Sequence, residues 1–368
     1  MMRPLRDASK ALGLWPTVAA LVGLGLGVVA LVVGWATGHG AVALGALDVG
    51  WLYCAGIAAG GVALSAAIRL SQGRWARAVT PVAEATSGFY WPALALLVLL
   101  VLAAPSWIPD AAREGRGAWG SRVARDVGAG VILFLAGELY VRRTRAGRET
   151  ATAAIVYLLL YVITLSLWAV DLVMGLSDWA PSTVIPPFYF IGALLGGLAL
   201  TALLSALRRP ETVGPPTRHD LGKLLFAFVI FWGYLAWAAY LPVWYGNMPE
   251  ETGQLLARWA DGWRGLTMAV LLTVLAFPFF FFLPEANKRG RSTIVVGAAS
   301  ILVGLLGERM LLVLPSLRSS LSAAEVVITL GVLLGVGGLF LVSFGARLAS
   351  APPIAPAKGA PADPGPHG

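Results

Sequence analysis

Short charged loops divide this sequence into ten apolar stretches, each long enough to cross a lipid bilayer as a helix. The stretches cover residues 17–37, 45–68, 90–108, 123–141, 151–174, 184–207, 221–245, 263–283, 292–315 and 323–346. About 20 residues at about 1.5 Å each cross a hydrocarbon layer of roughly 30 Å. Only 12% of the residues are charged, against about 25% in ordinary soluble domains. The sequence therefore predicts an all-α membrane protein with about ten transmembrane helices.

Lysine and arginine are unevenly distributed between the two sets of alternate loops. Of the 27, 19 lie in the termini and one set of loops, whereas 7 lie in the other set. Cytoplasmic loops carry the excess of positive charge, so both termini are predicted to be cytoplasmic. The same rule accounts for the net charge of +8 without nucleic-acid binding. Residues 1–16 form a cytoplasmic segment, 17–347 a ten-helix domain, and 348–368 a Pro/Ala/Gly tail expected to be disordered.

Cysteine and histidine are too scarce for most redox and metal chemistry. The single cysteine, Cys54, allows neither an internal disulfide nor an iron-sulfur cluster held by this chain alone. Three histidines, none of them in mid-helix, provide no pair of haem ligands and no metal site. Glycine-rich patches at residues 23–27, 55–61 and 192–197 predict close contacts between helices.

Ionisable residues inside membrane helices are costly and are therefore candidates for function. Asp48, Asp126, Glu325, Asp220 and Lys223 lie near predicted helix ends, where solvation at the membrane boundary is expected to explain them.

Two further carboxylates have more specific expected surroundings. Glu138 lies four residues before Arg142, a spacing that predicts an ion pair on one helix. Glu308 lies roughly 10 Å from its helix end by helical rise, deep enough for a functional role. Because Glu308 and Arg309 point about 100° apart, they are expected to serve different partners, with Arg309 neutralising Asp171 or Asp48.

The stretch at residues 217–252 is the most distinctive. Its apolar span is expected to end in an aromatic rim of Tyr240, Trp244 and Tyr245, followed by the acidic pair Glu250 and Glu251. Pro242 is expected to interrupt the end of this helix.

Three stretches resemble the NrfD/polysulfide-reductase-like membrane family, specifically the second NrfD-like subunit of alternative complex III, a bacterial quinol oxidoreductase. They are DLVMGLSDWAPSTVIPPFYFIGALLGG (171–197), HDLGKLLFAFVIFWGYLAWAAYLPVWYGNMPEET (219–252) and GERMLLVLPSL (307–317).

The resemblance implies two four-helix bundles plus a peripheral helix pair, located in the bacterial cytoplasmic membrane. The implied partners are lipids, a homologous NrfD-like membrane subunit and periplasmic subunits that carry iron-sulfur clusters and c-type haems. Menaquinone or ubiquinone is the implied ligand.

The resemblance also implies roles for particular residues. Those for quinone or proton binding on the outer side are Asp171, Tyr240, Trp244, Tyr245, Glu250, Glu251 and Arg264. A proton route is expected to use Glu308, Arg309, Glu138, His219, Asp220 and Lys223, with Tyr157, Tyr161, Thr164, Ser166 and Tyr234 between them.

Three functional hypotheses follow. The first is a subunit of a quinol:cytochrome c oxidoreductase that contributes to quinol binding or proton translocation and has no redox centre of its own. The second is a scaffold in the same complex, with the quinone bound by the companion subunit. The third is a secondary transporter, for which helices broken at the membrane midplane would be the sign.

Overall fold

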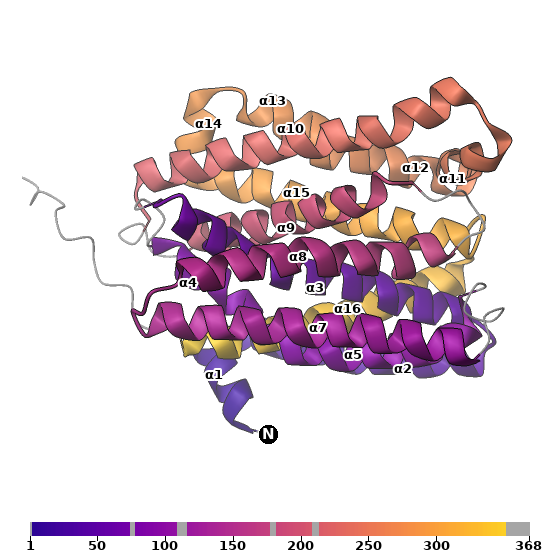
Figure 1. Cartoon of the computed structure of the whole chain (residues 1–368), viewed down its shortest axis with the longest axis horizontal. Helices are drawn as coiled ribbons and strands as arrows, with labels where there is room; N and C mark the ends of the chain where they lie inside the picture. The colour runs from indigo at the N-terminus through magenta and orange to yellow at the C-terminus, as the bar shows by residue number, and fades with distance from the viewer. Residues whose placement is uncertain (1, 74–77, 109–115, 177–181, 208–212, 351–368) are drawn as a thin grey trace, which may run out of the picture.

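The protein is a bundle of long helices lying roughly side by side (Figure 1). The computed structural model describes residues 2–73, 78–108, 116–176, 182–207 and 213–350. Nine helices among these residues are long and apolar enough to cross a membrane, and α7 (Arg116–Arg145) is a further helix of 30 residues. The prediction of an all-α membrane protein with about ten helices is confirmed. The predicted disordered tail lies almost wholly outside the described residues.

The other long helices are α2 (Leu14–Ala36), α3 (Gly40–Leu70), α5 (Tyr90–Ala103), α8 (Ala151–Leu172), α9 (Ile185–Leu207), α10 (Pro215–Gly246), α15 (Arg291–Val313) and α16 (Ala323–Ala349). The remaining span joins α12 (Asp261–Val270), a π-helical segment (Leu271–Ala276) and α13 (Phe277–Phe282). Shorter helices are α1 (Met2–Leu12), α4 (Thr80–Ala85), α11 (Pro249–Trp259) and α14 (Glu285–Arg289). Single 3₁₀ turns cover Thr86–Phe89, Ala104–Ser106, Met174–Leu176 and Leu314–Ser316.

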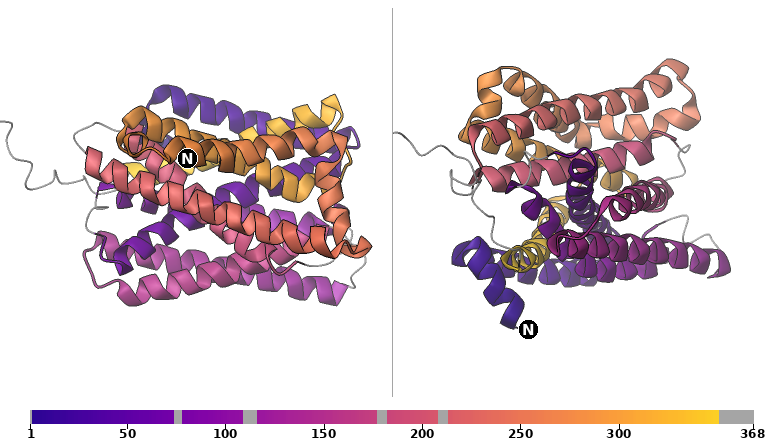
Figure 2. Two further views of the ribbon diagram at one scale, coloured as in Figure 1. Left: turned by 90° about the horizontal axis from the view of Figure 1, so that it is seen from above. Right: turned by 60° about the vertical axis from the view of Figure 1, so that its left-hand side comes forward.

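The helices form two groups and a peripheral pair, the arrangement expected from the resemblance. One group contains α3, α5, α7 and α8, and the other contains α9, α10, α12 with α13, and α15. Helices α3 and α9 join the groups, while α2 pairs with α16 on the outside. Helix α1 lies beside α16 (Figure 2).

The two ends of the bundle differ in charge. One end carries Arg69, Arg142, Arg145, Arg291 and Arg347, together with α14. We call it the arginine-rich end, and the positive-inside rule predicts that it is cytoplasmic. The end that carries α11 is called the opposite end.

Helix α10 differs from its prediction at Pro242. It continues past this residue to Gly246, so the expected interruption is wrong. Membrane helices tolerate proline because neighbouring groups and local adjustments satisfy the freed backbone carbonyls. The helix instead ends at Asn247, a left-handed residue with φ 45° whose N–H donates to the carbonyl of Val243 at 3.1 Å.

The glycine-rich patches do mark close helix contacts, as predicted. A Cβ atom on Gly60 of α3 would lie 2.2 Å from the carbonyl oxygen of Ala193 on α9, and one on Gly197 of α9 would lie 2.4 Å from the backbone nitrogen of Gly61. Backbone therefore packs directly on backbone where the two groups meet, which is the geometry that small residues allow in membranes.

Helix α16 begins with a reciprocal capping box. The Ser322 hydroxyl accepts from the Glu325 N–H at 3.3 Å, and the Glu325 carboxylate accepts from the Ser322 N–H at 2.9 Å. Glu325 also accepts from Arg318 Nε at 3.0 Å, so it is a buried capping residue and not merely a solvated residue at a membrane boundary.

Replacing Ser322 with alanine is expected to lower the free energy of unfolding by about 1 kcal/mol, because one helix N–H loses its partner. Unfolding by sodium dodecyl sulfate in mixed micelles measures the change. Ser319→Ala, an exposed serine of the same connection, is the control. Equal changes in the two variants would contradict the assignment.

Candidate functional site

A buried ion pair lies in the opposite half of the bundle, between α15 and α9. Arg309 Nη1 donates to Glu308 Oε1 at 2.8 Å, and Arg309 Nη2 donates to the carbonyl of Tyr189 at 3.1 Å. The guanidinium carbon lies 4.5 Å from the centroid of the Tyr189 ring. A Cβ on Gly192 would lie 2.8 Å from Arg309 Nη2, so this glycine of α9 leaves room for the pair.

The pair formed by Glu308 and Arg309 corrects the expectation that these neighbours serve different partners. Backbone directions about 100° apart do not prevent contact, because both side chains are long and bend toward each other in the crowded interior. Both are almost completely buried. A buried charge is tolerated only when it is paired, and each residue supplies the other's nearest opposite charge.

Two more ionisable residues lie near this pair, Asp48 beside Tyr189 and Arg258 beside Glu308. Asp48 of α3 is fully buried, and neither of its carboxylate oxygens has a hydrogen-bond partner among the described residues. Asp48 lies close enough to Tyr189 to interact with it electrostatically. The expectation that solvation at the boundary explains Asp48 is wrong, because α3 begins at Gly40 and places Asp48 two turns inside the helix. The same expectation fails for Asp126, whose exposed fraction is 1%.

Arg258 reaches the cluster from α11, outside the membrane spans. Its Nε donates to the carbonyl of Leu311 at 3.1 Å, while Nη2 is buried without a partner in the described part of the chain. Burial lowers the pKa of the guanidinium to about 10, and the Glu308 carboxylate opposes this shift. Arg258 therefore stays protonated at neutral pH. We define the outer ionic cluster as Asp48, Arg258, Glu308 and Arg309. Among the described residues no ion pair joins Asp48 to the other three.

Asp171 belongs to a second ionic group, on α7 and α8. Arg125 Nη2 donates to Asp171 Oδ2, and Arg122 Nε lies 3.7 Å from Asp171 Oδ1. Arg125 Nε also lies 3.5 Å from Asp126 Oδ1. The expectation that Arg309 neutralises Asp171 is therefore wrong, because Arg122 and Arg125 of α7 lie beside that carboxylate. Among the described residues Arg309 does not pair with Asp48 either.

The other residues expected on the outer side lie on a different part of the molecule. Tyr240 and Trp244 stack on α10 with ring centroids 6.3 Å apart, and Tyr245 is 82% exposed. Arg264 pairs with Asp261 at 3.5 Å. Glu251 is partly buried on α11, and the side chain of Glu250 lies outside the described residues. No hydrogen bond or ion pair among the described side chains joins this set to Asp171, which lies across α9 in the other helix group.

Residues of the expected proton route separate at the arginine-rich end. Glu138 accepts from Arg142 at 2.8 Å, as predicted, and also from Arg347 of α16 at 2.7 Å. His219, Asp220 and Lys223 lie on α10, in the other helix group. His219 Nε2 lies 3.9 Å from Glu285 Oε1, and Lys223 Nζ lies 2.7 Å from Asp220 Oδ1.

Buried tyrosines lie in series between the outer ionic cluster and the arginine-rich end, and the hydroxyls of Tyr189 and Tyr161 donate to backbone carbonyls. Tyr189 lies against Arg309, and the Tyr161 hydroxyl donates to the carbonyl of Phe190 at 2.5 Å. One turn along α8, the Tyr157 hydroxyl lies 2.7 Å from that of Tyr90 and donates to the carbonyl of Ala59 at 2.9 Å. Thr164 is buried on the same helix, whereas Tyr234 is 62% exposed on α10 and does not lie between these residues.

The series of tyrosines ends near the buried carboxylate of Glu84, which is not among the residues predicted from the sequence. The Tyr140 ring stacks on that of Tyr157 with centroids 6.4 Å apart, and its hydroxyl lies 3.0 Å from Ser65 Oγ. Ser65 Oγ donates to Glu84 Oε1 at 3.0 Å, and Glu84 is buried. We define the tyrosine column as Tyr189, Tyr161, Tyr157, Tyr90 and Tyr140.

Glu84 lies outside the predicted apolar stretch, which begins at residue 90. The span begins ten residues earlier, with α4 and a 3₁₀ turn, and this carries Glu84 into the bundle. A carboxylate within an otherwise uncharged run at 78–108 was the available signal. Arg258 is not among the predicted site residues because α11 lies in the predicted loop between the apolar stretches 221–245 and 263–283.

The buried side chains of the site, carboxylates and hydroxyls, are of kinds that bind and pass protons. In the described ranges, no three His, Cys, Asp or Glu side chains come together as metal ligands would. Comparisons with known proteins find no matching family model and no matching curated protein.

Proposed function

We propose that this protein is a membrane subunit of a quinol:electron-acceptor oxidoreductase and that its outer ionic cluster and tyrosine column handle protons released by quinol. The resemblance to the alternative complex III subunit motivates the choice of reaction. Oxidation of one quinol yields a quinone, two protons and two electrons. The electrons pass to iron-sulfur or haem carriers in partner subunits, and the protons require bases near the quinol.

The observation that carries the proposal is a pair of buried carboxylates with unused oxygens. Both oxygens of Asp48, and Oε2 of Glu308, have no hydrogen-bond partner within the described ranges. Such groups are expensive inside a membrane and are functional candidates by default. The tyrosine column supplies hydroxyls between them and Glu84.

A scaffold role within the same complex is the second candidate, and helix α10 favours it. Its aromatic side chains Tyr234, Trp237 and Trp244 are 62%, 56% and 58% exposed. A row of exposed aromatic residues suits contact with lipid or with a companion membrane subunit. The transporter alternative would be favoured by spans broken at the membrane midplane. Within the described spans, the α-helix is interrupted by the 3₁₀ turn Thr86–Phe89 and by the π-helical segment Leu271–Ala276, and the helical backbone continues through both.

Turnover of the purified complex tests the proposal. Asp48→Asn and Glu308→Gln are each expected to lower quinol-dependent reduction of the acceptor about tenfold or more, because a positioned base contributes at least this much. Asp261→Asn is the matched control, since this carboxylate is 96% exposed at the same end.

Co-purification decides between the remaining outcomes. Haem staining of the solubilised complex shows whether each variant still assembles with redox partners. Unchanged turnover in both variants, in an intact complex, removes the proposed proton role and leaves the scaffold. Purification of the wild-type chain without any haem or iron-sulfur partner rejects the oxidoreductase assignment.

A further inference from the structure

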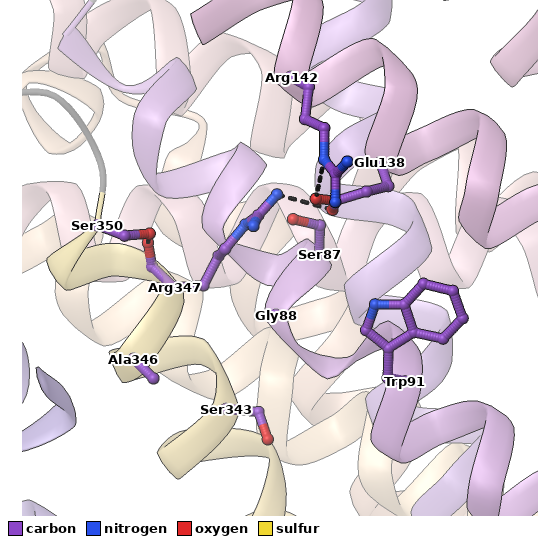
Figure 3. A pocket seen from close by; sticks show the side chains of 9 residues that line it. All are labelled: Ser87, Gly88, Trp91, Glu138, Arg142, Ser343, Ala346, Arg347 and Ser350. Atoms are coloured by element: carbon purple, nitrogen blue, oxygen red, sulfur yellow. Dashed lines mark hydrogen bonds and ion pairs between the residues drawn. The ribbon is translucent and has the colours of Figure 1, made fainter. Parts of the chain in front are cut away.

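A polar pocket opens at the arginine-rich end, apart from the outer ionic cluster. It has a volume of about 350 Å³ and lies between the first turn of α5, the last turns of α7 and the end of α16. Ser87, Gly88, Trp91, Glu138, Arg142, Ser343, Ala346, Arg347 and Ser350 line it. Figure 3 shows Glu138 between the guanidinium groups of Arg142 and Arg347, with Trp91 at one side of the pocket.

Positive charge exceeds negative charge around this pocket. Glu138 is shared by Arg142 and Arg347, so one carboxylate faces two guanidinium groups. Arg145 adds a third positive group, with Nη1 3.3 Å from Ser350 Oγ. Glu84 is the other nearby carboxylate, and it already accepts from Ser65. Three arginines and two carboxylates leave a net charge of about +1, which favours an anion.

Arg347, which lines the pocket, and Arg145, which contacts the lining residue Ser350, both have buried N–H groups without a partner in the described part of the chain. Arg347 Nε, and Nε and Nη2 of Arg145, have no hydrogen-bond partner among the described residues. The buried groups add positive charge beside the pocket, whereas the side chains of Arg142 and Arg347 are 74% and 24% exposed and can donate to a ligand in it. Arginine binds phosphate particularly well because its planar fork matches two oxygens.

The neighbouring surface suits acyl chains. Trp91 is 51% exposed, and indole rings prefer the boundary between headgroups and hydrocarbon. Leu99 and Leu102 on α5, and Leu135 and Leu139 on α7, are all about half exposed or more. A molecule with its phosphate in the pocket would therefore extend its tails along apolar helix faces. A free inorganic anion would not contact this apolar surface.

We propose that the pocket binds the phosphate group of an anionic phospholipid from the leaflet at the arginine-rich end. The phosphate oxygens accept from Arg142 and Arg347, Arg145 adds positive charge beside the pocket, and Trp91 lies at the headgroup boundary. Because Glu138 fixes Arg142 and Arg347 in position, the site is formed before the lipid arrives.

Native mass spectrometry of the full chain, titrated with phosphatidylglycerol or with zwitterionic phosphatidylcholine, tests the proposal. The wild type is expected to bind phosphatidylglycerol at least about tenfold more tightly. Arg142→Gln is expected to weaken phosphatidylglycerol binding about tenfold, the effect of losing a charged hydrogen bond. Arg143→Gln, the adjacent exposed arginine outside the pocket, is the control for charge.

A second variant tests the pocket itself without changing charge. Ala346→Phe is expected to fill the pocket and to weaken binding similarly, whereas Ala349→Phe on the exposed face of α16 is expected not to. Inorganic phosphate at millimolar concentration should compete only weakly. Equal binding of the two lipids, equal loss in the Arg143→Gln control, or full displacement by inorganic phosphate would each overturn the proposal.

Discussion

Replacing Arg309 with methionine is expected to destabilise the folded protein by about 3 to 5 kcal/mol, because Glu308 would keep a buried charge without its nearest partner. Both side chains are about 2 to 4% exposed, so water offers no substitute. The cation–π contact of Arg309 with the Tyr189 ring and its hydrogen bond to the Tyr189 carbonyl are lost as well. Unfolding in mixed micelles with sodium dodecyl sulfate measures the loss.

A matched surface pair provides the control for Arg309. Arg264 lies 3.5 Å from Asp261, but the two side chains are 60% and 96% exposed. Arg264→Met is therefore expected to cost less than about 1 kcal/mol. A double variant, Glu308→Leu with Arg309→Met, should recover much of the stability because no isolated charge remains from the pair. Equal losses in Arg309→Met and Arg264→Met would show that the buried pair is not important for stability.

Replacing Gly197 with alanine is expected to cost about 3 kcal/mol, the upper end of the usual effect of overpacking. The added methyl would lie 2.4 Å from Gly61 N and 2.5 Å from Gly60 C. These are backbone atoms, so no side chain can rotate away and α3 and α9 must separate. The separation would spread to both helix groups, since these two helices join them.

Gly25→Ala is the control, because nothing lies within 4 Å of a Cβ at Gly25 on α2. Alanine is favoured over glycine inside a helix by up to about 1 kcal/mol, so this variant should be neutral or slightly more stable. The same unfolding assay applies to both. A stable Gly197→Ala variant would contradict the close approach of α3 and α9.

The ionic clusters show how far spacing along the chain predicts contacts. Glu138 and Arg142 are four residues apart on one helix and do pair. Arg347 donates to the same carboxylate although it lies more than 200 positions further along the chain. No local spacing could indicate this contact. Helical geometry fixes neighbours within a turn, whereas partners on other helices depend on how the helices are placed and rotated.

The sequence by itself determined the helical fold, the number of spans and their connections, because a bilayer requires long apolar runs whose backbone groups are satisfied within each helix. It also determined the unequal charge of the two ends. Tertiary structure alone decided that Asp48 and Glu308 face the interior with unused oxygens, that Arg258 reaches into the bundle from α11, and that Glu84 ends a column of tyrosines. These outcomes depend on which face each helix turns inward, and nearly uniform apolar sequences leave that to packing against neighbouring helices.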